Sequence, residues 1–195
     1  MGRPERRPAH GALIIETERL TIEALDVGHA AGLFAALDDE RVGRFIGGPD
    51  VTSVEAVIAR IERVDAGPGP EWDEEWLNWA VLLDGVVIGR IEATLRHGVG
   101  RPGVAEIAYV FGPAWWGRGF ATEATAWMID HLASNHGATQ WWATVDPSNT
   151  ASINLLERLG FATTELPEFG LESFDEGDVV FVLRRGDEGD ALSEQ

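Results

Sequence analysis

The residues with the most distinctive spacing are Gly117 and Gly119, which lie between an alternating stretch and a helical one. Residues 106–111 alternate between two faces, as a strand does. A helix is expected from Phe120 or Ala121, so its free N–H groups and the positive end of its dipole face the glycines. Glycine lets the backbone approach a ligand closely. A strand that leads through glycines into a helix N-terminus predicts phosphate binding, although an ordinary turn has the same short pattern.

Two well-known phosphate loops do not match. A Walker A loop requires a lysine, and this chain has none, because all 15 of its basic Lys and Arg residues are arginine. A dinucleotide-binding fingerprint requires a third glycine in the first strand–helix unit. Here Thr122 holds that position, and the segment lies in the middle of the chain. Neither of these two phosphate loops therefore fits the segment.

Length and composition limit the classes of function. With 195 residues the chain predicts one domain over 14–185, with a disordered tail at 1–13 and an acidic tail at 186–195. The absence of cysteine excludes disulfides and thiolate metal sites, and no apolar run is long enough for a membrane span. A net charge of −18 argues against a nucleic-acid partner and favours cationic ones. We expect a cytoplasmic protein that binds neither nucleic acid nor membrane.

Hydrophobic periodicity and turn signals predict an alternation of strands and helices. Asp84-Gly85 is a strong hairpin signal, and Asn149 is a good helix cap. The expected strands lie within 14–24, 79–83, 86–94, 105–111, 140–145, 161–165 and 179–184, and the expected helices follow Asp26, Thr52 or Ser53, Gly119 and Asn149. The order is β-α-α-β-β-β-α-β-α-β-β.

An acidic and aromatic segment at 71–76 contains Trp72 and Trp76. It is expected to be a loop. One interpretation is a solvated loop whose tryptophans pack against the body of the protein. The other is a lip that attracts a cationic substrate through its charge and the faces of the two indoles.

Two motifs together resemble the GNAT acetyltransferase superfamily, in its Rim-type branch of ribosomal-protein N-terminal acetyltransferases. Residues 116–124 are similar to the family's pyrophosphate loop, with Trp116 where most members have Gln or Arg. Residues 149–161 are similar to its second motif, which ends in Gly-Phe. The resemblance covers about 16–185. It implies an α/β GNAT fold: one mixed, mostly antiparallel sheet of about seven strands, helices on both faces, and a splay between the strands at 105–111 and 139–145.

The resemblance implies acetyl-CoA as the acetyl donor, with CoA as a product, and no metal. Backbone groups near the end of the central strand would pair with the pantetheine arm, and the loop amides would hold the pyrophosphate. Arg118 either adds charge to the phosphates or points into solvent. Asn149 either bonds the pantetheine or only caps its helix. The implied cofactor-binding residues are Tyr109, Val110, Phe111, Trp116, Gly117, Arg118, Gly119, Phe120, Ala121, Thr122 and Asn149.

The resemblance also implies direct attack of an amine on the thioester. A carboxylate must accept the amine's proton, and Glu106 matches the glutamate of the Rim-type strand. Glu106 could instead be a paired structural carboxylate, and Glu92 is the reserve candidate, which we also place among the substrate-binding residues with Trp72 and Trp76. Many members use a tyrosine acid where this chain has Leu156. Ser152 is the available donor, unless it only serves the helix N-terminus.

The expected acceptor is a cationic amine, above all the α-amino group of a protein or peptide N-terminus. A small cationic amine, such as a polyamine or an aminoglycoside-like compound, is the main alternative, and lysine side chains come third. A catalytically silent domain that binds CoA is an alternative of another class. The acidic loop at 168–176 fits any cationic acceptor. A homodimer is an expectation from the resemblance alone, since dimers are common in the family.

Overall fold

The computed structural model describes residues 14–45, 51–69, 73–96, 103–164 and 177–185. Its strands form one eight-stranded sheet in the order β1-β2-β3-β4-β5-β6-β8-β7. The strands are β1 (Ile14–Glu16), β2 (Thr21–Ala24), β3 (Glu74–Leu83), β4 (Val86–Arg96), β5 (Gly103–Phe111), β6 (Ala138–Val145), β7 (Ala162–Thr164) and β8 (Val179–Arg184). The helices are η1 (Val27–His29), α1 (Ala30–Leu37), α2 (Glu40–Gly43), α3 (Val54–Asp65), η2 (Pro113–Trp115), α4 (Phe120–His136) and α5 (Thr150–Arg158).

The chain divides into two compact units, whose boundaries fall after Gly67 and inside β3, β4, β5 and α4. The first consists of Met1–Gly67, Asn78–Glu92 and Tyr109–Ala124. The second consists of Pro68–Leu77, Ala93–Ala108 and Thr125–Gln195. The tails at 1–13 and 186–195 and the acidic loop at 168–176 lie outside the described residues.

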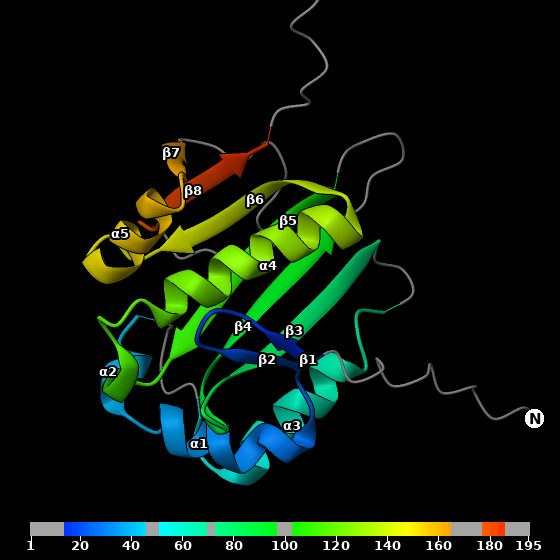
Figure 1. The fold of residues 1–195 in the computed structure, drawn as a ribbon, viewed down its shortest axis with the longest axis vertical. Helices are drawn as coiled ribbons and strands as arrows, with labels where there is room; N and C mark the ends of the chain where they lie inside the picture. Colours follow the sequence, from blue (N-terminus) through cyan, green and yellow to red (C-terminus); the bar gives the residue numbers. More distant parts are fainter. Residues whose placement is uncertain (1–13, 46–50, 70–72, 97–102, 165–176, 186–195) are drawn as a thin grey trace, which may run out of the picture. The chain divides into compact units, whose positions relative to one another are not determined.

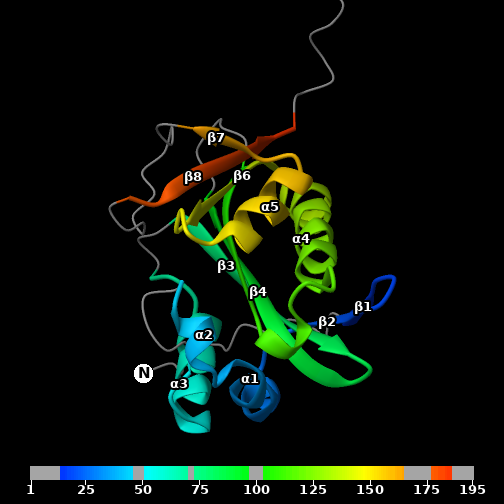
Figure 2. The ribbon, with the colours of Figure 1, turned by 90° about the vertical axis from the view of Figure 1, so that its left-hand side faces the viewer.

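In the first unit, helices α1 and α3 pack against each other (Figures 1 and 2). Asp26 caps η1 through the N–H of Gly28, and Ser53 caps α3 through the N–H of Ala56, so two of the predicted helix starts are confirmed. The buried side chains on which these helices meet are Ala30, Leu33, Ala36, Leu37, Val42, Val51, Val57, Ile61 and Val110. The core of this unit therefore extends to the end of β5, directly before the glycine loop.

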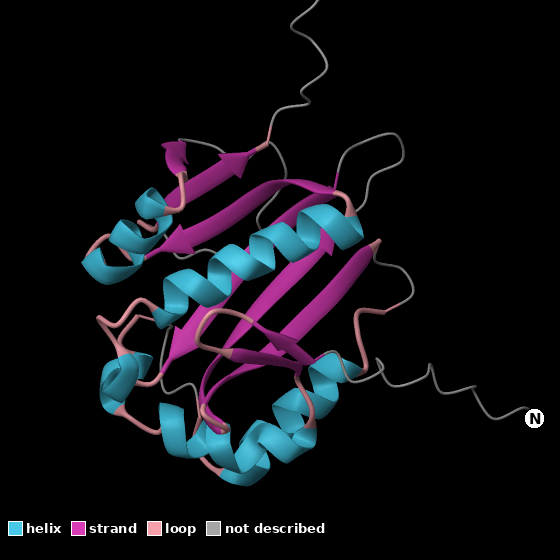
Figure 3. Cartoon of the chain, viewed as in Figure 1, coloured by secondary structure: helices cyan, strands magenta, loops and turns pink. Residues whose placement is uncertain are grey.

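In the second unit, β6 pairs antiparallel with β8 from Gln140–Arg184 to Val145–Val179, and β7 pairs with the other edge of β8 (Figure 3). Strand β5 pairs parallel with β6, and the last pair of this ladder is Glu106–Trp142. Both strands continue beyond that pair within the described chain. Within the described residues the pairing therefore ends at Glu106 and Trp142, where the resemblance implies a splay.

Two sequence predictions need correction. The stretch 14–24 is not one strand but a hairpin, with β1 and β2 paired from Ile14–Glu23 to Glu16–Thr21, so the sheet has eight strands rather than about seven. The N–H of Thr17 donates to the carbonyl of Leu20 at 2.8 Å and closes the turn. The acidic segment at 71–76 is only partly a loop, because β3 already begins at Glu74.

Candidate functional site

The loop between β5 and α4 lies in the first unit and combines two left-handed glycines with exposed backbone. Gly117 has φ of 71° and Gly119 has φ of 82°, a region that other residues rarely adopt. Gly119 precedes α4, whose first intrahelical bond runs from the N–H of Glu123 to the carbonyl of Gly119 at 3.0 Å. Within the described residues, the backbone N–H groups from Gly117 to Thr122 have no acceptor. Consecutive free N–H groups at a helix N-terminus are the donor set that a diphosphate needs.

The Trp116 side chain links this loop to the end of β5. Its indole Nε1–H donates to the carbonyl of Phe111 at 2.6 Å, so the end of β5 and the start of the loop are tied together. The residue is 45% exposed, and the guanidinium of Arg41 lies 6.0 Å from the ring centroid. The residue that replaces the family's usual Gln or Arg thus has a structural role that the sequence did not reveal. The carbonyl of Phe111 retains one lone pair for a ligand.

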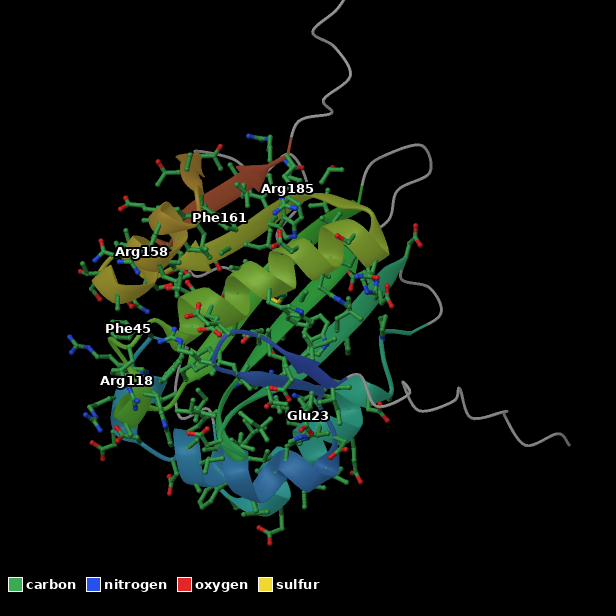
Figure 4. The ribbon with its side chains drawn as sticks, in the orientation of Figure 1. Glu23, Phe45, Arg118, Arg158, Phe161 and Arg185 are labelled. Atoms are coloured by element: carbon green, nitrogen blue, oxygen red, sulfur yellow. The ribbon has the colours of Figure 1, made fainter. Side chains whose placement is uncertain are left out.

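Arg118 is exposed at the N-terminal end of α4 (Figure 4). Its guanidinium carbon lies 4.8 Å from the ring centroid of Phe120. The guanidinium therefore packs against the Phe120 ring, and its N–H donors can still turn towards an anion.

Glu92, the reserve candidate for the base, lies in the first unit between two arginines. Its Oε2 accepts from Arg60 Nη2 at 2.7 Å and lies 3.6 Å from Arg90 Nε. Burial alone would raise the pKa of Glu92, but Arg90 and Arg60 outweigh it and hold the pKa below its ordinary value. A carboxylate with a lowered pKa is a weaker base, so this geometry disfavours Glu92 as a proton acceptor.

Glu106 lies in the second unit and shares an arginine with a second carboxylate. Arg96 Nη1 donates to Glu106 Oε2 at 3.2 Å, and Arg96 Nε donates to Glu74 Oε1 at 2.7 Å. Burial would lower the pKa of Arg96, but the two carboxylates outweigh it and raise the pKa above its ordinary value, so the guanidinium stays charged. The Glu106 side chain is 18% exposed, so it is shielded without being sealed from solvent.

Trp76 joins the same cluster, because its Nε1–H donates to Glu74 Oε2 at 3.2 Å. The structure thus brings two of the predicted site residues, Glu106 and Trp76, together through Arg96 and Glu74. Arg96 escaped the sequence analysis because the expected strand ended at Thr94, whereas β4 continues to Arg96. Trp72 lies outside the described residues.

The α5 N-terminus, also in the second unit, holds the other predicted polar residues. Asn149 Oδ1 accepts from the N–H of Ser152 at 3.1 Å, so the predicted cap is confirmed. The amide nitrogen of Asn149 keeps its two N–H donors for other partners. Leu156, at the position where many family members have a tyrosine, is fully buried.

Among the described residues, no helix is long and apolar enough to cross a membrane. In the same part of the chain, no three or more histidine, aspartate or glutamate side chains gather as metal ligands would.

Comparisons with known proteins agree with this geometry. The profile of the acetyltransferase (GNAT) domain matches residues 19–162. The chain is similar to the uncharacterized N-acetyltransferase YoaA of Bacillus subtilis strain 168, with 28% identity over 76% of this chain and 82% of that one. It is also similar to the uncharacterized N-acetyltransferase p20 of Bacillus licheniformis, with 30% identity over 74% of this chain and 80% of that one.

The fold is also that of RimL, an α-N-protein acetyltransferase of ribosomal L7/L12 solved in complex with coenzyme A. The two structures match with a TM-score of 0.69 and 15% identity, over 88% of this chain and 98% of RimL. At this identity the match concerns the fold alone. The domain match, by contrast, spans most of the chain and includes both the glycine loop and α5. The chain belongs to the GNAT acetyltransferase family and is an acyltransferase.

Proposed function

We propose that this enzyme transfers an acetyl group from acetyl-CoA to the α-amino group of a protein or peptide N-terminus, as members of the Rim-type branch do. Family membership supports the acetyl donor and the nitrogen acceptor. The observation that supports a cationic amine as acceptor is the cluster of Glu106, Glu74, Arg96 and Trp76. It places negative charge and an aromatic ring beside the candidate base.

The glycine loop is the part of the chain that fits acetyl-CoA. The free N–H groups from Gly117 to Thr122 would hold the diphosphate, and Arg118 would add positive charge. Tyr109, Val110 and Phe111 would pair with the pantetheine arm, and an N–H near Val110 would stabilise the oxyanion. Acetyl-CoA supplies a thioester whose thiol leaving group, with a pKa of about 8.5, needs little help from an acid. Ser152 is therefore assigned a supporting role as proton donor.

Glu106 is the residue we assign as general base. As the amine nitrogen bonds to the acetyl carbon, the carbon–sulfur bond breaks and the amine loses a proton, which Glu106 accepts directly or through a water. An α-amino group is suited to this weak base, because its ordinary pKa of about 7.7–8.0 lies well below the value of about 10.4 for lysine. A useful fraction of N-termini is therefore already neutral near pH 7, which favours them over lysine side chains.

A small cationic amine is the second candidate acceptor. The same two carboxylates and the ring of Trp76 attract any compact cation, including a polyamine. The two candidates differ in the charge that the acceptor carries beyond the reacting nitrogen.

The test is release of free CoA thiol from acetyl-CoA with three acceptor sets: N-terminal peptides, the same peptides with blocked N-termini, and polyamines with aminoglycosides. Turnover on free but not blocked peptides, with the acetyl group located on the α-nitrogen by mass spectrometry, is the expected result. Turnover on the polycations alone would replace the first candidate by the second. Binding of CoA without turnover on any set would contradict both.

A further inference from the structure

The turn between β1 and β2 makes a set of contacts with the glycine loop that the catalytic roles above do not use. Thr17 Oγ1 donates to Glu123 Oε1 at 2.6 Å, and the backbone N–H of Arg19 donates to the same oxygen at 2.8 Å. Arg19 Nε donates to Glu123 Oε2 at 2.7 Å. All three residues belong to the first unit. Both oxygens of Glu123, in the first turn of α4, are thus engaged by a turn about a hundred residues away in sequence.

Arg19 also reaches the loop itself. Its Nη1 donates to the carbonyl of Arg118 at 3.0 Å, and its guanidinium carbon lies 4.7 Å from the ring centroid of Phe120. The carbonyl of Arg118 and the N–H of Gly119 belong to one planar peptide unit and point in opposite directions. A donor that fixes this carbonyl therefore fixes the direction of the Gly119 N–H, one of the free donors of the loop.

The charges of Glu123 and Arg19 also affect how the loop would bind a diphosphate. Glu123 carries a carboxylate into the first turn of α4, where the helix dipole favours an anion and where a phosphate would compete for the same positive end. Burial would raise the pKa of Glu123, but the hydrogen bonds from Thr17 and Arg19 outweigh it and keep the pKa below its ordinary value. Glu123 is thus ionised at neutral pH, and without Arg19 its charge would repel a bound diphosphate.

We infer that Arg19 is a positioning residue of the diphosphate loop: it holds the Arg118 carbonyl so that the loop N–H groups face the ligand, and it neutralises Glu123 beside them. This inference rests on the proposed use of acetyl-CoA. Its ligand is a diphosphate-containing donor, and it is independent of the acceptor.

The test is the dissociation constant of CoA, measured by calorimetry for wild type, Arg19→Gln, Glu123→Gln and the double variant. Arg19→Gln is expected to weaken CoA binding about 10- to 100-fold, the usual effect of losing hydrogen bonds to a charged partner. Glu123→Gln should stay within about threefold of wild type, because a repulsive charge and an anchor for Arg19 are lost together. The double variant should bind CoA at least about threefold more tightly than Arg19→Gln alone.

Three outcomes would overturn the inference. CoA binding by Arg19→Gln at the wild-type level would remove the positioning role. A double variant no better than Arg19→Gln would remove the electrostatic part. A lowered kcat at saturating acetyl-CoA, with an unchanged KM for acetyl-CoA, would show that Arg19 acts on another step. Failure of wild type to bind CoA would instead contradict the proposed function itself.

Two further variants keep the test decisive if Arg19→Gln does not fold. Arg19→Lys keeps the charge but cannot bond Glu123 and the Arg118 carbonyl through one planar fork, so its CoA affinity should fall between wild type and Arg19→Gln. Arg63→Gln, which changes an exposed arginine in the last turn of α3, is the matched control for loss of one positive charge in the same unit. Wild-type CoA affinity in Arg19→Lys, together with an equal loss of affinity in Arg63→Gln and Arg19→Gln, would reduce the effect to overall charge and overturn the positioning role.

Discussion

The cluster around Glu92 in the first unit and the cluster around Glu106 in the second are built from the same two residue types in opposite proportions. Arg60 and Arg90 both face the single carboxylate of Glu92. Arg96, by contrast, divides its guanidinium between Glu74 and Glu106. The first arrangement uses the carboxylate to compensate buried positive charge. The second gathers two carboxylates around one arginine, which suits it to a cationic substrate and to proton transfer.

The distances point the same way. The closest arginine contact of Glu92 is 2.7 Å, whereas that between Arg96 and Glu106 is 3.2 Å, with the shorter 2.7 Å contact of Arg96 given to Glu74. Arg90 is only 6% exposed at its side chain, so Glu92 neutralises a charge that water scarcely reaches. The comparison predicts a structural role for Glu92 and a chemical one for Glu106.

The largest expected effect is on the rate of acetyl transfer. Glu106→Gln should lower kcat about 10²- to 10⁴-fold, the usual contribution of a general base, while the CoA dissociation constant stays within about twofold of wild type. Glu92→Gln, the matched control, should keep kcat within about tenfold of wild type. Thiol release under saturating acetyl-CoA measures both variants. A Glu92→Gln variant that loses more activity than Glu106→Gln would reverse the assignment.

The second-largest effect is on the free energy of unfolding. Here Glu92→Gln should have the larger effect and Glu106→Gln the smaller one, the reverse of their order for kcat. Glu92→Gln removes a negative charge beside the buried Arg90 and should lower the free energy of unfolding by about 2 kcal/mol. We place this below the value of about 3–5 kcal/mol for sealed ion pairs, because the Arg60 and Glu92 side chains are 25% and 23% exposed. Glu106→Gln should cost less than about 1 kcal/mol, since Arg96 keeps Glu74.

Urea unfolding of the two variants at pH about 7 measures this difference. Equal losses of stability would mean that both clusters are structural. The two clusters would then differ in their arginine–carboxylate distances but not in their roles.

The third effect is the pH dependence of stability, which follows from the lowered pKa of Glu92. Because the folded pKa lies below the ordinary value of 4.5, the contribution of Glu92 is complete above that pH and is lost as the pH falls through the folded pKa. The stability difference between wild type and Glu92→Gln should therefore shrink as the pH falls below the ordinary value of 4.5. Urea unfolding across this range checks it, and a constant difference would contradict the lowered pKa.

The elements that local sequence patterns determine were predicted well. Asp84-Gly85 forms the hairpin turn with φ of 50° and 77°, and Gly137 ends α4 with φ of 67°, as their residue types require. The hairpin of β1 and β2 was missed, because no glycine or proline marks a turn within residues 14–24. The turn at Thr17 is held by Glu123, which is 106 residues away, and no local pattern reports a bond of that range.

The candidate site divides in the same way. The glycine loop and the Asn149 cap are local features and could be read from residue types and their order. The arginines that separate the roles of Glu92 and Glu106 come from other elements: Arg60 from α3 and Arg96 from the end of β4. Ion pairs between elements leave no fixed spacing in the sequence, so the choice between the two carboxylates needed the structure.

The smallest expected effect concerns the acceptor and tests the second cluster alone. Glu74→Gln removes one of the two carboxylates that share Arg96 and leaves the Arg96 guanidinium to Glu106. The local charge becomes less negative, so the KM of a cationic peptide N-terminus should rise about fivefold, while kcat stays within about twofold of wild type. Initial rates over a range of peptide concentrations separate the two constants, and added salt should reduce the difference in KM. If kcat falls and the KM of the peptide does not rise, Glu74 acts by orienting Glu106 through Arg96. The second cluster then positions the base and does not bind the charge of the acceptor.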